Sequence, residues 1–82
     1  MIDNRTKMVI AVSNYDLKQS TKPGFNRYAL PQYLHAVDRV MEDLESGMAL
    51  RQAIVSNFTG RLATAVLKAV GEPALTREEA RA

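Results

Sequence analysis

A stripe of apolar residues between positions 33 and 44 constrains the fold of this chain more than any other feature. The apolar positions recur every three or four residues, which is the period of one face of an α-helix. Pro31 suits the first turn of such a helix, and Gly47 is the residue type that commonly ends one. We therefore predict a helix over about residues 31–46. Its inward-facing residues are Tyr33, Leu34, Val37, Val40, Met41 and Leu44.

Two more helices are predicted downstream, over about residues 48–58 and about residues 60–70. Thr59 can cap the second of them, and Gly71 follows its last turn. Apolar side chains cover most of the circumference of this helix, so we expect it to be the most buried of the three. The sequence from Thr76 to Glu79 has the pattern of a capping box and predicts a short final helical turn.

The N-terminal third of the chain is ambiguous. Met8–Val12 is rich in β-branched residues, and β-propensity favours a short strand there. Met8, Ala11, Val12 and Tyr15 also fit a helical period, and periodicity cannot decide over so short a run. A strand at this position would find no partner within the chain. It would pair with its own copy in a dimer, or add to the sheet edge of another protein.

Residues 18–27 lie between the ambiguous N-terminal segment and the first predicted helix, and they have the composition of an exposed loop. From Lys22 to Tyr28, cations alternate with the aromatic rings of Phe25 and Tyr28, a pattern that could stack on unpaired bases. The other interpretation, which we favour, is that both rings fold back onto the start of the following helix.

The predicted fold class is mainly α, in three parts. A three-helix core occupies residues 30–71. It is preceded by an extended basic N-terminal arm with one short strand, residues 1–29, and followed by a short helical turn or frayed tail, residues 72–82. A chain of 82 residues has room for one hydrophobic core.

The composition excludes several kinds of chemistry. The chain has no Cys and one His, which excludes thiolate zinc sites, iron–sulfur clusters and cysteine nucleophiles. It also has no glycine-rich phosphate loop and no nucleophile elbow, so we predict a non-enzyme without catalytic residues, cofactor, metal or small-molecule substrate. The longest apolar run, Met8–Val12, is shorter than a membrane span or a signal peptide, so we expect a soluble cytoplasmic protein.

The formal charge of +2 conceals blocks of opposite sign. Residues 1–34 carry five bases and two acids, whereas residues 35–46 carry one base and four acids. Residues 47–71 contain three bases and no acid. The first predicted helix therefore has an acidic solvent face, and the following helical pair is basic.

The acid-free block coincides with two helices joined at residues 57–60, which is the spacing of a helix-turn-helix. The second helix would be the recognition helix. Its exposed residues Arg61, Thr64 and Lys68 suit contact with phosphate better than contact with base edges. We therefore predict a non-catalytic regulator that binds nucleic acid, acting as a homodimer. The predicted contact residues are Lys18, Lys22, Arg27, Arg51, Arg61, Thr64 and Lys68.

The alternative hypothesis is an adaptor or inhibitor that occupies a surface of another protein. It depends on the unpaired strand and on the acidic face of the first predicted helix. The predicted partner-binding residues are Met8, Val9, Ile10, Val12, Asp38, Glu42, Asp43 and Glu45.

Overall fold

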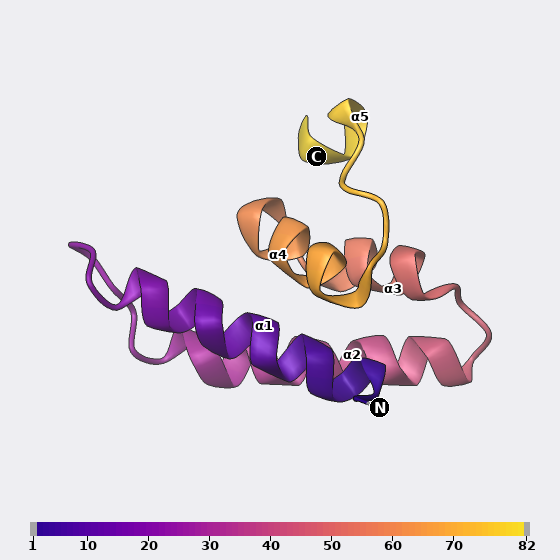
Figure 1. Cartoon of the computed structure of the whole chain (residues 1–82), viewed down its shortest axis with the longest axis horizontal. Coiled ribbons are helices and arrows are strands. Elements are labelled where there is room, and N and C mark those ends of the chain that lie inside the picture. The colour runs from indigo at the N-terminus through magenta and orange to yellow at the C-terminus, as the bar shows by residue number, and fades with distance from the viewer. Residues whose placement is uncertain (1, 82) are drawn as a thin grey trace.

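The computed structural model describes residues 2–81, and this part of the chain is mainly helical (Figure 1). Positions 1 and 82, the outer limits of the predicted three-part division, lie outside the described residues. The helices are α1 (Asn4–Gln19), α2 (Ala29–Glu45), α3 (Leu50–Asn57), α4 (Gly60–Val70) and α5 (Arg77–Arg81).

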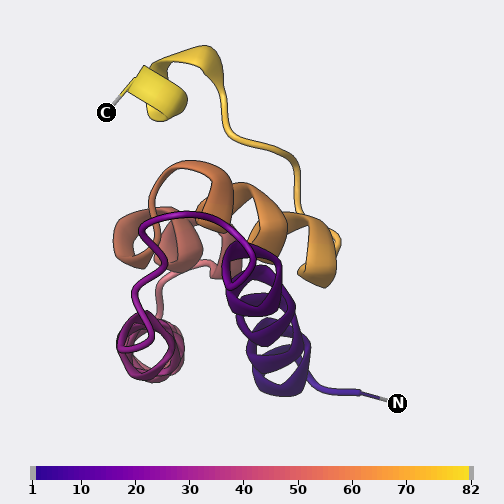
Figure 2. The same ribbon diagram turned by 90° about the vertical axis from the view of Figure 1, so that its left-hand side faces the viewer.

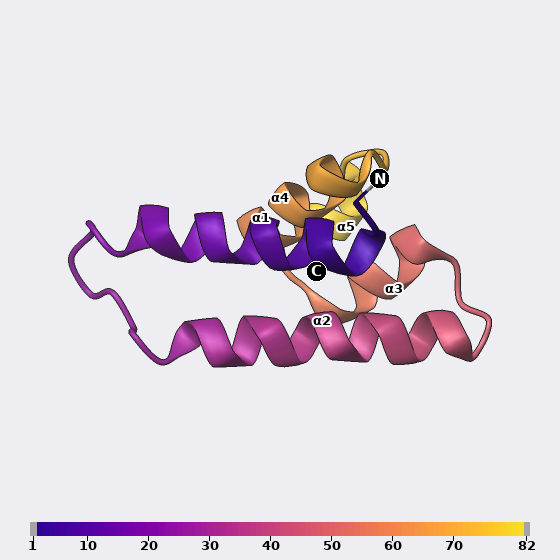
Figure 3. The same ribbon diagram turned by 60° about the horizontal axis from the view of Figure 1, so that its bottom comes forward.

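The helices form two layers, with α5 set apart from both. The long helices α1 and α2 run antiparallel, side by side, and are joined by a loop over residues 20–28 (Figure 3). The shorter helices α3 and α4 lie across them, and α5 sits on the far side of α3 and α4 (Figure 2). No helix within residues 2–81 combines the length and apolar content needed to cross a membrane.

The three helices predicted from periodicity are confirmed as α2, α3 and α4. The first begins two residues earlier than predicted, at Ala29. Gly71 ends α4 with a φ of 77°, and Gly47 follows α2 with a φ of 100°. Side chains with a Cβ avoid this left-handed region, so glycine is the residue suited to both positions.

The predicted strand at Met8–Val12 is wrong, because these residues lie within α1. Asp3 caps the N-terminus of α1, and its side-chain Oδ1 accepts a 2.8 Å hydrogen bond from the N–H of Thr6. Met8 and Val12 are one turn apart and fully buried. Pairing of this segment with a second strand, in a dimer or on another protein, is therefore excluded in this conformation.

The hydrophobic core draws on four helices, and α1 is one of them. α1 packs most extensively against α4 and also against α2, so it is part of the core and not an extended arm. α4 contributes the most buried residues, as predicted. The buried residues are Met8, Val12, Val37, Val40, Ala53, Ile54, Phe58, Leu62, Ala63, Val66 and Leu67.

The loop between α1 and α2 departs from the prediction at one aromatic ring. Tyr28 is 71% exposed, so it does not fold back onto the start of α2. Its backbone N–H donates a 2.9 Å hydrogen bond to Oδ1 of Asn26, which makes a tight turn before the helix. Phe25 is 36% exposed and lines a pocket against both long helices.

The predicted capping box opens α5. The Thr76 N–H donates to Glu79 Oε1 at 2.7 Å, and the Glu79 N–H donates to Thr76 Oγ1 at 3.2 Å. None of the residues of α5 is buried. Burial within α5 therefore does not hold this helix near the body of the protein.

Candidate nucleic-acid interface

A groove of about 460 Å³ runs between α1 and α4. Lys18 and Lys68, both exposed, line it from opposite helices, while small residues such as Ala11 and Ala65 form much of its surface. Ile10 is 46% exposed at the same site. The complete lining contains no acidic residue. It consists of Ile10, Ala11, Asn14, Tyr15, Lys18, Ala65, Lys68 and Ala69.

The exposed strip of α4 continues this basic surface. Arg61, Thr64 and Lys68 follow one another at helical spacing, and all three are exposed. The Thr64 hydroxyl donates a 3.3 Å hydrogen bond to the Gly60 carbonyl, one turn earlier. The predicted polar strip therefore lies on the surface, with Lys68 next to the groove and Arg61 nearly two turns away along the helix.

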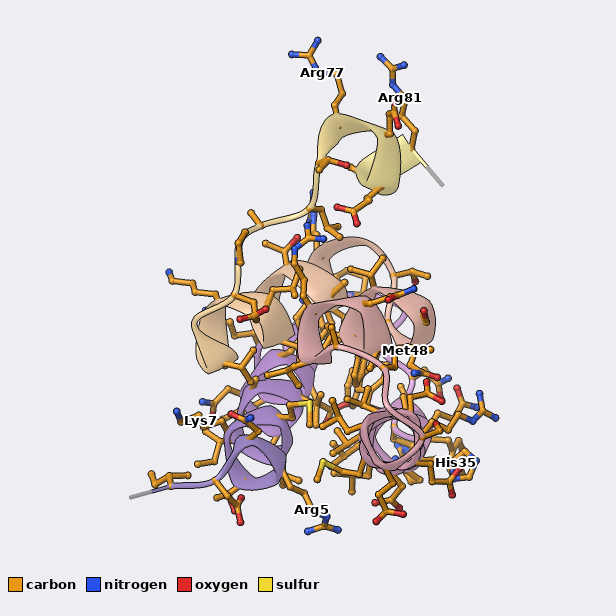
Figure 4. All side chains as sticks on the ribbon, turned by 90° about the vertical axis from the view of Figure 1, so that its right-hand side faces the viewer. Arg5, Lys7, His35, Met48, Arg77 and Arg81 are labelled. Atoms are coloured by element: carbon orange, nitrogen blue, oxygen red, sulfur yellow. The ribbon has the colours of Figure 1, made fainter. Side chains whose placement is uncertain are left out.

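Lys7 belongs to the same flank of α1 and was not predicted. It precedes Asn14 by seven residues and Lys18 by eleven, which places all three along one line of an α-helix. Figure 4 shows Lys7 pointing away from α2, whereas Arg5 reaches toward α2. A helical interpretation of Met8–Val12 would have revealed this alignment from the sequence.

Arg51 is engaged elsewhere in the structure. Its guanidinium makes two hydrogen bonds to the Glu79 carboxylate, at 2.7 Å and 3.0 Å. It also donates to the carbonyls of Pro73 and Ala74, at 3.1 Å and 2.7 Å. These four bonds tie the C-terminal segment to α3, and we call them the Arg51 clamp. The structure therefore gives Arg51 an internal partner, which sequence reasoning missed.

The pKa values of both partners in the clamp reflect their pairing. The hydrogen bond from Arg51 is the largest influence on Glu79 and, with the Thr76 N–H, lowers the pKa of that carboxyl from 4.5 to about 2. The hydrogen bond to Glu79 raises the pKa of Arg51. The pair is therefore ionised throughout the physiological range.

Two predicted loop cations, Lys22 and Arg27, do not line the α1–α4 groove. Lys22 is exposed and lines the pocket between the loop and the two long helices. Arg27 is exposed in the same loop. Of the seven predicted nucleic-acid contacts, the structure brings Lys18 and Lys68 together at one groove. Arg61 and Thr64 extend the same surface.

Two of the four acidic residues of the alternative hypothesis make contacts with other side chains of the chain. Asp38 forms an ion pair with Arg5, with 3.5 Å between the charged groups. Asp43 Oδ2 accepts a 2.8 Å hydrogen bond from the side-chain amide of Asn57. Glu42 and Glu45 are exposed. In the predicted strand segment, Val9 is partly buried against the core and Ile10 faces the groove.

No group of three or more His, Cys, Asp or Glu side chains in the described residues is arranged to hold a metal ion. Comparison with protein-family models, with characterised proteins and with solved structures finds no match. Function is therefore inferred from the geometry of this chain alone.

Proposed function

We propose that this protein binds nucleic acid through its basic flank, defined as Lys7 and Lys18 of α1 with Arg61 and Lys68 of α4. The observation that carries the proposal is the meeting of Lys18 and Lys68, fifty positions apart in the sequence, at one groove without an acidic residue. Clustered cations neutralise phosphates and release condensed counterions, which drives binding that is independent of sequence.

The arrangement of α3 and α4 supports a helix-turn-helix mode. The two helices are separated by Phe58 and Thr59 alone, and α4 exposes its polar strip along its length. Arg61, Thr64 and Lys68 offer few groups that read base edges. We therefore expect strong salt dependence and weak discrimination between sequences.

The decisive experiment compares two triple variants of equal charge. Fluorescence polarisation would measure binding to duplex and single-stranded oligonucleotides between low and moderate salt. Substituting Lys18, Lys68 and Arg61 together by Ala should weaken binding and reduce the slope of log K against log salt by about 2 to 3.

The control substitutes three exposed cations away from the basic flank. Arg39 lies on α2, and Arg77 and Arg81 project outward from α5 (Figure 4). Their replacement by Ala should leave the slope unchanged. An equal loss in both triple variants, or no binding by the parent protein at low salt, would contradict the proposal.

A homodimer is part of the proposal. One copy offers only a short polar strip on α4, and two copies would double the phosphate contacts. Sedimentation equilibrium with and without oligonucleotide tests this, with a two-to-one protein-to-duplex complex as the expected result. A one-to-one complex would contradict the homodimer but would still be consistent with binding through the basic flank.

Of the two features on which the adaptor hypothesis depends, only the acidic surface of α2 is present in the structure. The buried positions of Met8 and Val12 leave no strand to donate, and Asp38 and Asp43 already have partners within the chain. Glu42 and Glu45 are too few to define a specific acidic surface, so we favour the basic flank.

A further inference from the structure

A second cavity, separate in function from the basic flank, lies where α1 ends and α2 begins. Its volume is about 280 Å³, and the loop over residues 20–28 covers one side. Tyr15 and Asp16 enter it from α1, Tyr33 from α2, and Phe25 and Lys22 from the loop. We call this cavity the loop pocket.

Asp16 is unusual within this pocket. Its Oδ1 atom is buried and has no hydrogen-bond partner. Asp16 also lies in the last turn of α1, where the aligned peptide dipoles place partial negative charge. This helix position is unfavourable for a carboxylate. A positively charged group in the pocket, which Asp16 lines, would offset it.

The walls of the pocket favour an organic cation. The rings of Tyr15 and Tyr33 meet edge to face, with centroids 6.1 Å apart and planes at 72°, and Phe25 adds a third ring. Aromatic rings beside a carboxylate are the chemistry by which proteins recognise ammonium groups, through cation–π attraction and ionic pairing.

The electrostatics of Tyr33 agree with this geometry. Burial is the main cause that raises the pKa of its phenol, and the nearby Tyr15 and Asp16 raise it further. The phenol is therefore neutral at physiological pH, which leaves Asp16 as the one acidic side chain in the lining of the pocket.

We propose that the loop pocket binds an organic ammonium group, with Asp16 as its counter-ion and Tyr15, Tyr33 and Phe25 as its aromatic walls. A carboxylate in the lining disfavours an anionic ligand, and one carboxylate with two phenols is a poor donor set for a divalent metal. The ligand is either a free small amine or a methylated lysine side chain of another protein, because both present the same group.

The test is a titration of the full chain followed by amide NMR. Tetramethylammonium is the charged probe, and tert-butanol is a neutral probe of similar shape. We expect tetramethylammonium, and not tert-butanol, to cause saturable shifts at residues 15–16 and 24–26. Absence of saturable shifts, or equal effects of the two probes, would overturn the proposal.

Asp16→Asn removes the charge and keeps the shape of the side chain. It should weaken tetramethylammonium binding about tenfold, which corresponds to about 1.4 kcal/mol. Glu45→Gln makes the same charge change at an exposed site on α2 and should leave binding unchanged. If Asp16→Asn does not fold, Tyr33→Leu replaces it, because loss of the ring should also weaken binding. Unchanged affinity in the variant used would overturn the proposal.

Lys22 provides the competing explanation, because its own ammonium could enter the pocket. Lys22→Ala distinguishes the two cases. Binding by the parent chain, little changed in Lys22→Ala, supports an external ligand, whereas binding that appears only in Lys22→Ala would identify Lys22 as the natural occupant. A trimethyllysine peptide that binds at least tenfold tighter than tetramethylammonium would identify a protein lysine as the source. Equal affinities would indicate a small amine.

Discussion

The two ends of the chain are attached to the protein in opposite ways. α1 is held by apolar surface, since Met8 and Val12 are fully buried against α2 and α4. α5 contains no buried residue and is held by the Arg51 clamp. Hydrophobic attachment is non-directional and insensitive to pH. Attachment through an ion pair depends on geometry and ionisation, so the two ends should respond differently to the same perturbation.

Of the two ends, α1 is the one at which the larger effect is expected. Met8→Ala should lower the free energy of unfolding by about 2–5 kcal/mol, because it leaves a cavity in the core. Phe58→Ala, elsewhere in the same core, should cost about 3–5 kcal/mol. Urea denaturation followed by circular dichroism measures both.

Ile10→Ala is the matched control on α1, because Ile10 is 46% exposed in the groove. It should cost well under half as much as Met8→Ala. Similar costs for Ile10→Ala and Met8→Ala would contradict the burial of one face of α1.

A smaller and local effect is expected at α5 on acidification. Glu79 has a pKa of about 2 in the folded chain, against an ordinary value of 4.5. The unfolded chain therefore binds more protons between these values, so the contribution of Glu79 to stability is complete above pH 4.5 and is lost as the pH falls toward 2. The protection factor of the Ala80 amide, whose N–H donates to the Thr76 carbonyl, should fall over this interval when exchange is compared with the intrinsic rate at each pH.

Arg51→Ala should produce the same release of α5 at neutral pH. Met8 and Val12 are held without charged groups, so amides in the middle of α1 should stay protected in this variant. Exchange of the α1 and α5 amides to equal extents in Arg51→Ala would show that the two ends do not behave independently.

The smallest effect is expected at the ion pair between Arg5 and Asp38. The two charged groups are 3.5 Å apart, and their side chains are 58% and 56% exposed. Pairs of this kind contribute about 0–1 kcal/mol. Arg5→Ala should therefore change the midpoint of thermal unfolding very little. A loss comparable to that of Met8→Ala would mean that charge, and not apolar burial, anchors α1.

The sequence predicted those elements whose signals are local. The apolar period of α2, the glycines at positions 47 and 71, and the capping box at Thr76 each depend on residues within a few positions of one another. α1 was missed because its stripe is narrow and because Val9, Ile10 and Val12 give the segment a high β-propensity. The N-terminal cap at Asp3 and the helical spacing of Met8 and Val12 were the available signals.

Residue types in the candidate site were easier to predict than their partners. The exposed strip of Arg61, Thr64 and Lys68 followed from helical period alone. The engagement of Arg51 by Glu79 depends on the path of residues 71–76, which no local pattern encodes. The meeting of Lys18 with Lys68 likewise required the packing of α1 on α4.

The packing of α1 against α4 also means that α1 cannot be covered until α4 has been synthesised. About half of the sequence, residues 20–59, separates the two helices, so this segment must bring its ends together before their contacts can form. During synthesis α1 emerges before α4, and the residues of α4 that cover Met8 and Val12 follow some fifty positions later. At ordinary rates of translation the apolar face of α1 remains uncovered for roughly several seconds. In the nascent chain, α1 is therefore a candidate for binding by chaperones that recognise apolar segments.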